Sequence, residues 1–147
     1  MTIHGEQPLI RVVHDESRSD LRDPARPRPV RLYLWEPDLP LALPAPLVVV
    51  SHGTGGSGSS MGWPAGPLRQ AGFRVVALDH HGNNFVDGYE PEGFLHVWER
   101  PRDVSFALDA LASERPPALS VRRGSPWAAA RRWPSPVLVS IRGSSGR

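Results

Sequence analysis

Two short apolar runs constrain the fold of this chain more than any other feature of its sequence. The runs are Leu47–Val50 and Phe73–Asp79, and the Gly/Ser-rich stretch His52–Ser60 opens the segment between them. Continuous apolar runs of this length are typical of strands that are covered on both faces of a parallel sheet. Parallel neighbours need a long crossover connection, and the intervening segment can hold a helix. The pattern predicts a β-α-β unit within an α/β fold.

The residues before this unit offer elements that suit the same fold. Leu9–His14 is a short apolar run, and Val30–Trp35 is rich in β-branched and aromatic residues, which favours a strand. The stretch Asp15–Pro29 is rich in Asp, Arg and Pro, so we expect a surface connection there. Together these elements predict a central, mostly parallel sheet with helices on its faces.

One flanking helix is visible in the sequence after a polar loop over His80–Trp98. Pro101 suits the first turn of a helix, and Asp103 lies near its positive end. Apolar residues then follow with the spacing i, i+3, i+4 and i+7, namely Val104, Ala107, Leu108 and Leu111. This stripe predicts a helix that packs on the sheet.

The composition excludes several classes of function. There are no cysteines, which excludes disulfides, cysteine-containing zinc sites and thiol nucleophiles. All 17 basic residues are arginine, so a Walker-type phosphate loop and a Schiff-base lysine are excluded as well. No stretch approaches the roughly 18 apolar residues of a membrane span, and residues 1–20 lack the apolar core of a secretion signal. We expect a soluble, cytoplasmic protein.

The charge of the chain divides it into two parts. Residues 1–114 contain ten arginines and all 15 acidic residues, whereas residues 115–147 contain seven arginines and no acidic residue. The second part is rich in Arg, Pro, Ser and Gly, and only Val137–Val139 resembles a strand. The sequence therefore predicts a folded unit over residues 1–114 and a disordered or irregular tail over residues 115–147.

Two explanations of the tail stay open. Arginine is the only basic residue type, and the chain has 17 prolines and 14 glycines, which indicates a GC-rich gene. Reading such a gene out of frame yields the composition of the tail. This frameshift hypothesis predicts a strand followed by G-x-S-x-G in another frame downstream of the Ala118 codon. The alternative is a noncatalytic protein that binds a partner through a genuine basic tail. Aromatic residues are not interleaved with the arginines for stacking, so no specific nucleic-acid binding is expected.

The glycine loop matches three motifs, and the first is a dinucleotide-binding fingerprint. Gly53, Gly55 and Gly58 spell G-x-G-x-x-G after a strand, and Asp79 follows at the distance typical of the ribose-binding acid in an NAD(P)-binding Rossmann-like domain. Such a site needs a helix that begins within the glycines. The prolines and glycines of residues 62–67 would break that helix, which argues against this interpretation.

The other two motifs concern acyl transfer. Gly58, Ser60 and Gly62 spell the G-x-S-x-G of a nucleophile elbow, but an elbow serine sits at the tip of a strand and Ser60 lies nine residues past Ser51. We therefore expect Ser60 to be a loop serine that caps the following helix. The residues His52–Gly56 instead suit an oxyanion loop, in which backbone N–H groups of a glycine-rich turn stabilise the negative oxygen formed during acyl transfer.

The chain resembles bacterial α/β-hydrolases of the dienelactone-hydrolase and platelet-activating-factor-acetylhydrolase-like kind. Four segments carry the resemblance in this order: RPVRLYLWEP, PLVVVSHGTGGSGSS, AGFRVVALDHHGNNF and WERPRDVSFALDAL. It covers about residues 9–114 and implies the N-terminal half of an α/β-hydrolase fold. It also implies a serine hydrolase that acts on small-molecule carboxylic esters without a cofactor.

The resemblance assigns roles to residues of two loops. It implies that Thr54 supplies an oxyanion N–H, within an oxyanion loop of His52, Gly53, Thr54, Gly55 and Gly56. The D-H-x-G-N-x-F segment begins at Asp79 and includes Gly82, and in such folds it lines the cleft above the sheet. A purely structural role of this loop stays open. The cleft-lining candidates are His80, His81, Asn83, Asn84 and Phe85. The segment Trp98–Pro101 is expected to be architectural.

The catalytic residues of such a hydrolase cannot be placed in this chain. The family uses a serine on an elbow, an acid and a late histidine in that order. The elbow is expected soon after Ala112, where the tail begins, and the last histidine is His96. We expect the chain to be truncated before the nucleophile and inactive, with an open sheet edge that favours self-association. No metal site is expected, because adjacent histidines at a strand end point apart and no carboxylate pair joins them.

Overall fold

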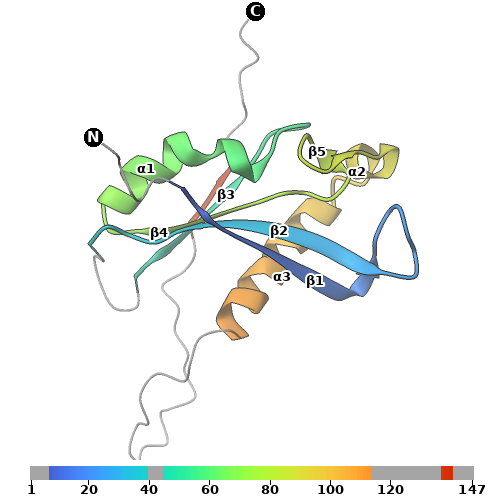
Figure 1. Ribbon diagram of the computed structural model, residues 1–147, viewed down its shortest axis with the longest axis horizontal. Helices are drawn as coiled ribbons and strands as arrows, with labels where there is room; N and C mark the ends of the chain where they lie inside the picture. Colours follow the sequence, from blue (N-terminus) through green and yellow to red (C-terminus); the bar gives the residue numbers. More distant parts are fainter. Residues whose placement is uncertain (1–6, 40–44, 114–136, 141–147) are drawn as a thin grey trace, which may run out of the picture.

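The protein has a mixed α/β fold in the computed structural model, which describes residues 7–39, 45–113 and 137–140 (Figure 1). The described part of the chain contains a five-stranded sheet with the strand order β1-β2-β4-β3-β7. Its strands are β1 (Leu9–Ser19), β2 (Pro27–Trp35), β3 (Leu47–Ser51), β4 (Arg74–Leu78) and β7 (Val137–Ser140). The other elements are the 3-10 helix η1 (Gly58–Ser60), α1 (Gly62–Gln70), β5 (Asn83–Asn84), β6 (Gly88–Tyr89), α2 (Pro91–Leu95) and α3 (Glu99–Ser113).

The sheet is mixed rather than mostly parallel, so the predicted strand arrangement was wrong in this respect. The strand β3 pairs in parallel with β4 and with β7. The strand β1 pairs antiparallel with β2, and β2 pairs antiparallel with β4. Antiparallel pairing therefore accounts for the larger part of the sheet. A short connection joins β1 to β2, and such a connection permits a hairpin but no parallel crossover.

The core lies on both faces of the sheet, because residues of β2, β3 and β4 alternate between two buried layers. In β3, for example, Val49 belongs to the cluster that contains Leu111 of α3, and Val50 belongs to the cluster that contains Ala65 of α1. Figure 1 shows α1 and α3 on opposite sides of the sheet. Strands covered on both faces need apolar residues at nearly every position, which explains the continuous runs in the sequence.

The predicted β-α-β unit and the predicted helix are confirmed. The parallel strands β3 and β4 are joined through α1, and α3 buries Ala107 and Leu111 of the predicted stripe. The helix α1 contains Pro67 and the other residues that were expected to break a helix begun at Gly55. Because α1 begins only at Gly62, Pro64 falls in its first turn, where a backbone N–H has no partner within the helix.

Three local predictions were wrong. The strand β1 runs to Ser19, because Arg18 in its polar second half pairs with Glu99 of α3 at 2.7 Å. The segment His80–Trp98 is not a plain loop, since β5, β6 and α2 lie within it. The capping serine is Ser57, whose Oγ accepts a hydrogen bond from the Ser59 N–H at the start of η1, whereas Ser60 lies inside η1.

The predicted tail contributes one described strand to the sheet. Residues 137–140 form β7 beside β3, so the expectation of an irregular tail was wrong for this segment, and β3 is not an open edge. The parallel register places Ser140 opposite Ser51. The predictions for residues 115–136 and 141–147 lie outside the described residues. Within the described ranges, no helix has the length and apolar character that crossing a membrane requires.

Gly58 provides a test of how tightly the glycine loop packs on the sheet. A Cβ atom at this position would lie 2.5 Å from the ring of Tyr33 and 3.1 Å from the backbone nitrogen of Leu78. We expect Gly58→Ala to lower the free energy of unfolding by about 2 kcal/mol, because Tyr33 is buried and cannot move aside. A Cβ at Gly62 would meet nothing within 4 Å, so Gly62→Ala is the matched control and should change stability by less than about 0.5 kcal/mol. Equal unfolding curves for the two variants in urea would contradict this packing.

Candidate functional site

Two loops meet at the carboxyl ends of the parallel strands β3 and β4. Ser51, at the end of β3, lies opposite Leu78, at the end of β4. The glycine loop His52–Gly56 therefore begins beside the segment Asp79–Phe85, as expected for parallel neighbours. Backbone contacts join them, since the Phe85 N–H donates a hydrogen bond to the carbonyl of Gly56 at 3.2 Å. The two segments that the sequence singled out thus form one site.

Asp79 lies beneath the glycine loop and is only 2 % exposed. Its Oδ1 accepts hydrogen bonds from the Ser57 hydroxyl and the Gly58 N–H, both at 2.7 Å, and its Oδ2 accepts one from the Tyr33 hydroxyl at 2.8 Å. A ribose-binding acid must instead face the ligand. The loop is also followed by η1, and α1 begins only at Gly62, beyond the glycines. The structure therefore argues against the dinucleotide-binding alternative and indicates that Asp79 holds the loop.

The glycine loop is fixed around Gly55. Gly55 has a φ of 72°, a conformation that side chains disfavour, and its N–H donates to Asn83 Oδ1 at 2.6 Å. The Tyr89 hydroxyl donates to the Gly55 carbonyl at 3.0 Å. Thr54 is exposed, and its N–H donates to no acceptor within the part of the chain that the structure describes. The turn thus leaves the Thr54 N–H without an acceptor in the described part of the chain.

His52 packs inside the loop and is 1 % exposed. Its Nε2 accepts a hydrogen bond from the His80 N–H at 3.2 Å, so Nε2 carries no proton. The proton of the neutral ring is therefore on Nδ1, which lies 2.6 Å from the Gly53 carbonyl and donates to it. Burial lowers the pKa of His52 to about 4, which keeps the ring neutral near pH 7.

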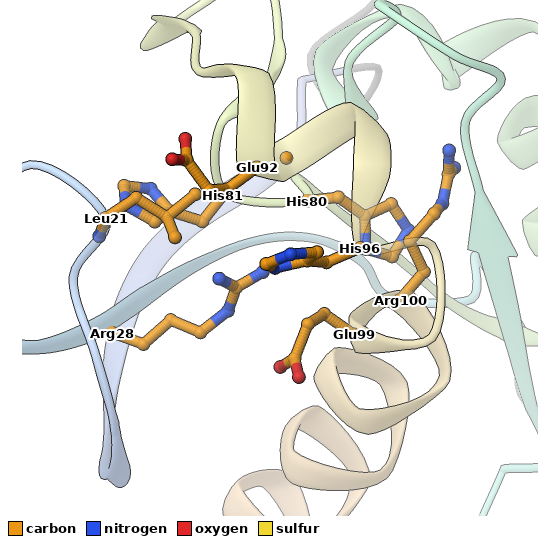
Figure 2. A pocket seen from close by; sticks show the side chains of 9 residues that line it. Leu21, Arg28, His80, His81, Glu92, His96, Glu99 and Arg100 are labelled. Carbon is orange, nitrogen blue, oxygen red and sulfur yellow. Dashed lines mark hydrogen bonds between the residues drawn. The ribbon is translucent and has the colours of Figure 1, made fainter.

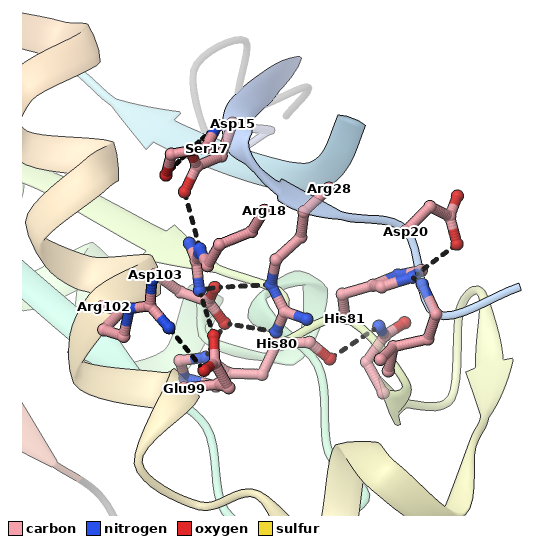
Figure 3. Close-up of polar contacts among 12 residues, drawn as sticks. Asp15, Ser17, Arg18, Asp20, Arg28, His80, His81, Glu99, Arg102 and Asp103 are labelled. Atoms are coloured by element: carbon pink, nitrogen blue, oxygen red, sulfur yellow. Dashed lines mark hydrogen bonds and ion pairs between the residues drawn. The ribbon is translucent and has the colours of Figure 1, made fainter. Parts of the chain in front are cut away.

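A buried polar chain beneath the loop was not predicted from the sequence. Ser51 Oγ lies 2.8 Å from His80 Nε2. His80 Nδ1 lies 3.0 Å from Asp103 Oδ2, and Figure 3 shows these two residues. Asp103 also forms ion pairs with Arg28 at 2.9 Å and Arg18 at 2.8 Å. Burial alone would raise the pKa of Asp103, but the hydrogen bonds from His80 and Arg28 and the positive charge of Arg28 lower it to about 2. The ionised carboxylate thus requires the proton of neutral His80 on Nδ1.

The order Ser51–His80–Asp103 has the pairwise distances of a nucleophilic triad. Ser51, however, is only 9 % exposed, and its Oγ also accepts a hydrogen bond from Arg100 Nη2 at 3.2 Å. The same Nη2 donates to the carbonyl of His52. This series of hydrogen bonds therefore connects α3 to the glycine loop in the protein interior. The only sequence signal near this series was the segment Trp98–Pro101, which is followed by the acidic residue Asp103. The sequence predicted only an architectural role for that segment.

The other cleft-lining candidates divide into buried and exposed groups. Asn83 and Asn84 are buried, and Asn84 Nδ2 donates to the His80 carbonyl at 3.1 Å. Phe85 is 53 % exposed. His81 points away from His80 and pairs with Asp20 at 2.9 Å (Figure 3). These contacts give the segment structural roles, with Asn83 holding the glycine loop.

A small cavity lies beside His80 and His81 (Figure 2). Its volume of about 10 Å³ corresponds to roughly one water molecule. In the described ranges, no group of three or more His, Asp or Glu side chains could hold a metal ion. The cavity is lined by Leu21, Arg28, His80, His81, Glu92, Gly93, His96, Glu99 and Arg100.

Comparisons with known proteins assign no family to this chain. No family model, no curated protein and no solved structure matches it. The contacts of the site itself indicate its chemistry, chiefly the Thr54 N–H, which no described residue accepts, and the buried groups behind it.

Acid should destabilise the protein through its buried histidines. The pKa of His52 is lower in the folded state than the ordinary value of 6.5, so the unfolded chain binds the proton more tightly. The stability contributed by neutral His52 is complete above about pH 6.5 and is lost as the pH falls toward 4, an effect of about 3 kcal/mol. Burial lowers the pKa values of His80 and His81 in the same direction.

Urea denaturation at pH 7 and at pH 4.5 measures this effect. We expect a clearly lower midpoint at pH 4.5. Asp103 contributes little to the change in stability between pH 7 and pH 4.5. Its pKa is lowered to about 2, so the stability that it provides is lost only below the ordinary pKa of 3.8. An unchanged midpoint between the two pH values would show that the histidines are not held neutral by the fold.

Proposed function

We propose that this chain carries the oxyanion-binding part of a serine hydrolase that acts on small-molecule carboxylic esters. The proposal rests on the N–H of Thr54, an exposed residue, which has no acceptor among the described residues and lies in a turn fixed by Asn83. The proposal includes the incomplete α/β-hydrolase fold that the sequence resemblance implies. In that fold the H-G-x-G turn follows the third strand, and here it follows β3.

The chemistry of ester hydrolysis explains why such a donor is useful. Attack of a nucleophile on the ester carbonyl converts its oxygen to an oxyanion, and a fixed N–H stabilises that charge more than it stabilises the ground state. A preorganised donor needs no rearrangement during the reaction. The contacts of Gly55 with Asn83 and Tyr89 keep the turn in one conformation. The turn therefore suits a role in which it binds the carbonyl oxygen of the ester.

Neither of the two candidate serines in the described part of the chain, Ser60 and Ser51, is placed as a nucleophile. Ser60 Oγ donates to the carbonyl of Ser57 at 2.8 Å within η1, which is no strand tip. Ser51 lies beneath the loop and is engaged by His80 and Arg100. We therefore expect that a fluorophosphonate probe labels no serine of this chain. Labelling of Ser60 or Ser51, located by peptide mass spectrometry, would contradict the proposed absence of a nucleophile.

Reading the gene in the other frame downstream of the Ala118 codon provides the positive test. If that frame encodes a strand followed by G-x-S-x-G, the corresponding extended protein should hydrolyse p-nitrophenyl esters. In that protein Thr54→Pro removes the backbone N–H and should lower kcat about 100- to 1000-fold with little change in KM.

Thr54→Ala is the matched control for this test, because it removes the side chain and keeps the N–H. We expect its kcat to stay close to that of the unsubstituted extended protein. Equal activities of the Pro and Ala variants would overturn the role of the Thr54 N–H. The lack of any elbow in the other frames would overturn the frameshift hypothesis.

A further inference from the structure

A buried side chain donates a hydrogen bond to the peptide group that carries the Thr54 N–H. The carbonyl of this peptide group belongs to Gly53, and it accepts two hydrogen bonds. One comes from His52 Nδ1 at 2.6 Å, and the other comes from the Gly56 N–H at 3.0 Å. Hydrogen bonds that run through the same peptide group polarise one another. Donation to the Gly53 carbonyl therefore makes the Thr54 N–H a stronger donor.

The surrounding contacts fix His52 in the form that can donate. The His80 N–H donates a hydrogen bond to Nε2 of His52, so the proton of the His52 ring is on Nδ1. A Cβ atom at Gly56 would lie 3.3 Å from His52 Nδ1 and 3.2 Å from the Gly53 oxygen, so the glycine leaves room for this hydrogen bond. His52 is thus held in one position and one tautomer.

Arg100 adds a positive charge to the same loop. Among the described residues, Arg18, Arg28 and Arg102 pair with carboxylates, whereas no described carboxylate forms an ion pair with Arg100. Its guanidinium is half-buried and donates instead to the His52 carbonyl and to Ser51 Oγ. In Figure 2 its side chain points away from the other residues that line the cavity. The buried charge of Asp103 attracts this cation, but no described carboxylate forms an ion pair with it, and such a cation favours an anion at the neighbouring turn.

We propose that His52 is a positioning residue that polarises the Gly53–Thr54 peptide, and that with the Arg100 cation it makes this turn a binding site for a small carboxylate. The inference rests on the proposed function, in which the same donor meets the oxyanion and a carboxylate is the product. It adds the residues that set the strength of the donor. It also adds a ligand that the chain can bind without a nucleophile.

Acetate titration of the 15N-labelled full chain tests this inference, with sodium chloride holding the ionic strength constant. We expect acetate to shift the Thr54 amide resonance saturably, whereas acetamide, a neutral molecule of the same shape, should not. An absence of any saturable response at Thr54 would overturn the inference. The proposed function fails separately, through equal ester hydrolysis by the Thr54→Pro and Thr54→Ala proteins.

Two substitutions of His52 separate its two hydrogen bonds. His52→Asn retains a donor near the position of Nδ1, and His52→Gln retains an acceptor near the position of Nε2. We expect acetate affinity to fall at least threefold in His52→Gln and by less in His52→Asn. Equal affinity of His52→Gln and the unsubstituted chain would overturn the polarising role of His52.

Arg100→Gln tests the charge and keeps the experiment decisive if a His52 variant fails to fold. We expect weaker acetate binding in Arg100→Gln and unchanged binding in Arg102→Gln, since Arg102 is exposed and pairs with Glu99 on the same helix. Equal weakening in both variants would reduce the effect to a general surface charge and overturn the role of Arg100. Amide spectra of each variant report whether the fold is retained.

Discussion

The carboxylate of Asp103 is the group on which the rest of this structure depends. It is fully buried in α3 and binds Arg18 of β1, Arg28 of β2 and His80, which follows β4 (Figure 3). A buried charge is tolerated only when its partners compensate the lost hydration, and removal of one partner leaves the others unpaired. Asp103 therefore joins the antiparallel half of the sheet to the loop beyond β4. The apolar stripe of α3 provides its burial, and the carboxylate fixes the position of the helix along the sheet.

The glycine loop depends on this ion cluster through His80. Ionised Asp103 places the ring proton of His80 on Nδ1, so Nε2 accepts from Ser51, and the His80 backbone N–H in turn occupies His52. From His52 the chain continues to the Gly53 carbonyl and so to the peptide group of Thr54. Asp103 sets the ring tautomer of His80, and the His80 backbone N–H separately sets the ring tautomer of His52. Buried hydrogen-bond partners thus hold the groups behind an exposed turn, and a turn of this kind suits the stabilisation of developing negative charge.

The sequence predicted the elements that depend on local pattern and missed those that depend on distant pairing. The apolar runs of β3 and β4 and the stripe of α3 were recognisable, because burial on two faces or on one helical face leaves a periodic signature. The second half of β1 was not predicted, since its Arg18 is held by Glu99 and Asp103, more than 80 residues away. The hydrogen-bonded series Ser51–His80–Asp103 was not predicted for the same reason, because no spacing rule connects three residues on different elements. The glycine turn was predicted as a site, but the contacts were needed to identify His52 as a donor and Arg100 as a cation without an ion-pair partner among the described residues.

The tautomers of His52 and His80 test the central claim most directly, namely that buried hydrogen-bond partners set the proton positions behind the glycine turn. The 15N chemical shifts of the two imidazole rings at pH 7 distinguish a protonated Nδ1 from a protonated Nε2 and from a charged ring. The structure requires both rings to be neutral with the proton on Nδ1, because ionised Asp103 faces His80 Nδ1 and the His80 N–H faces His52 Nε2. A proton on Nε2 of either ring, or a charged ring at this pH, would contradict the account.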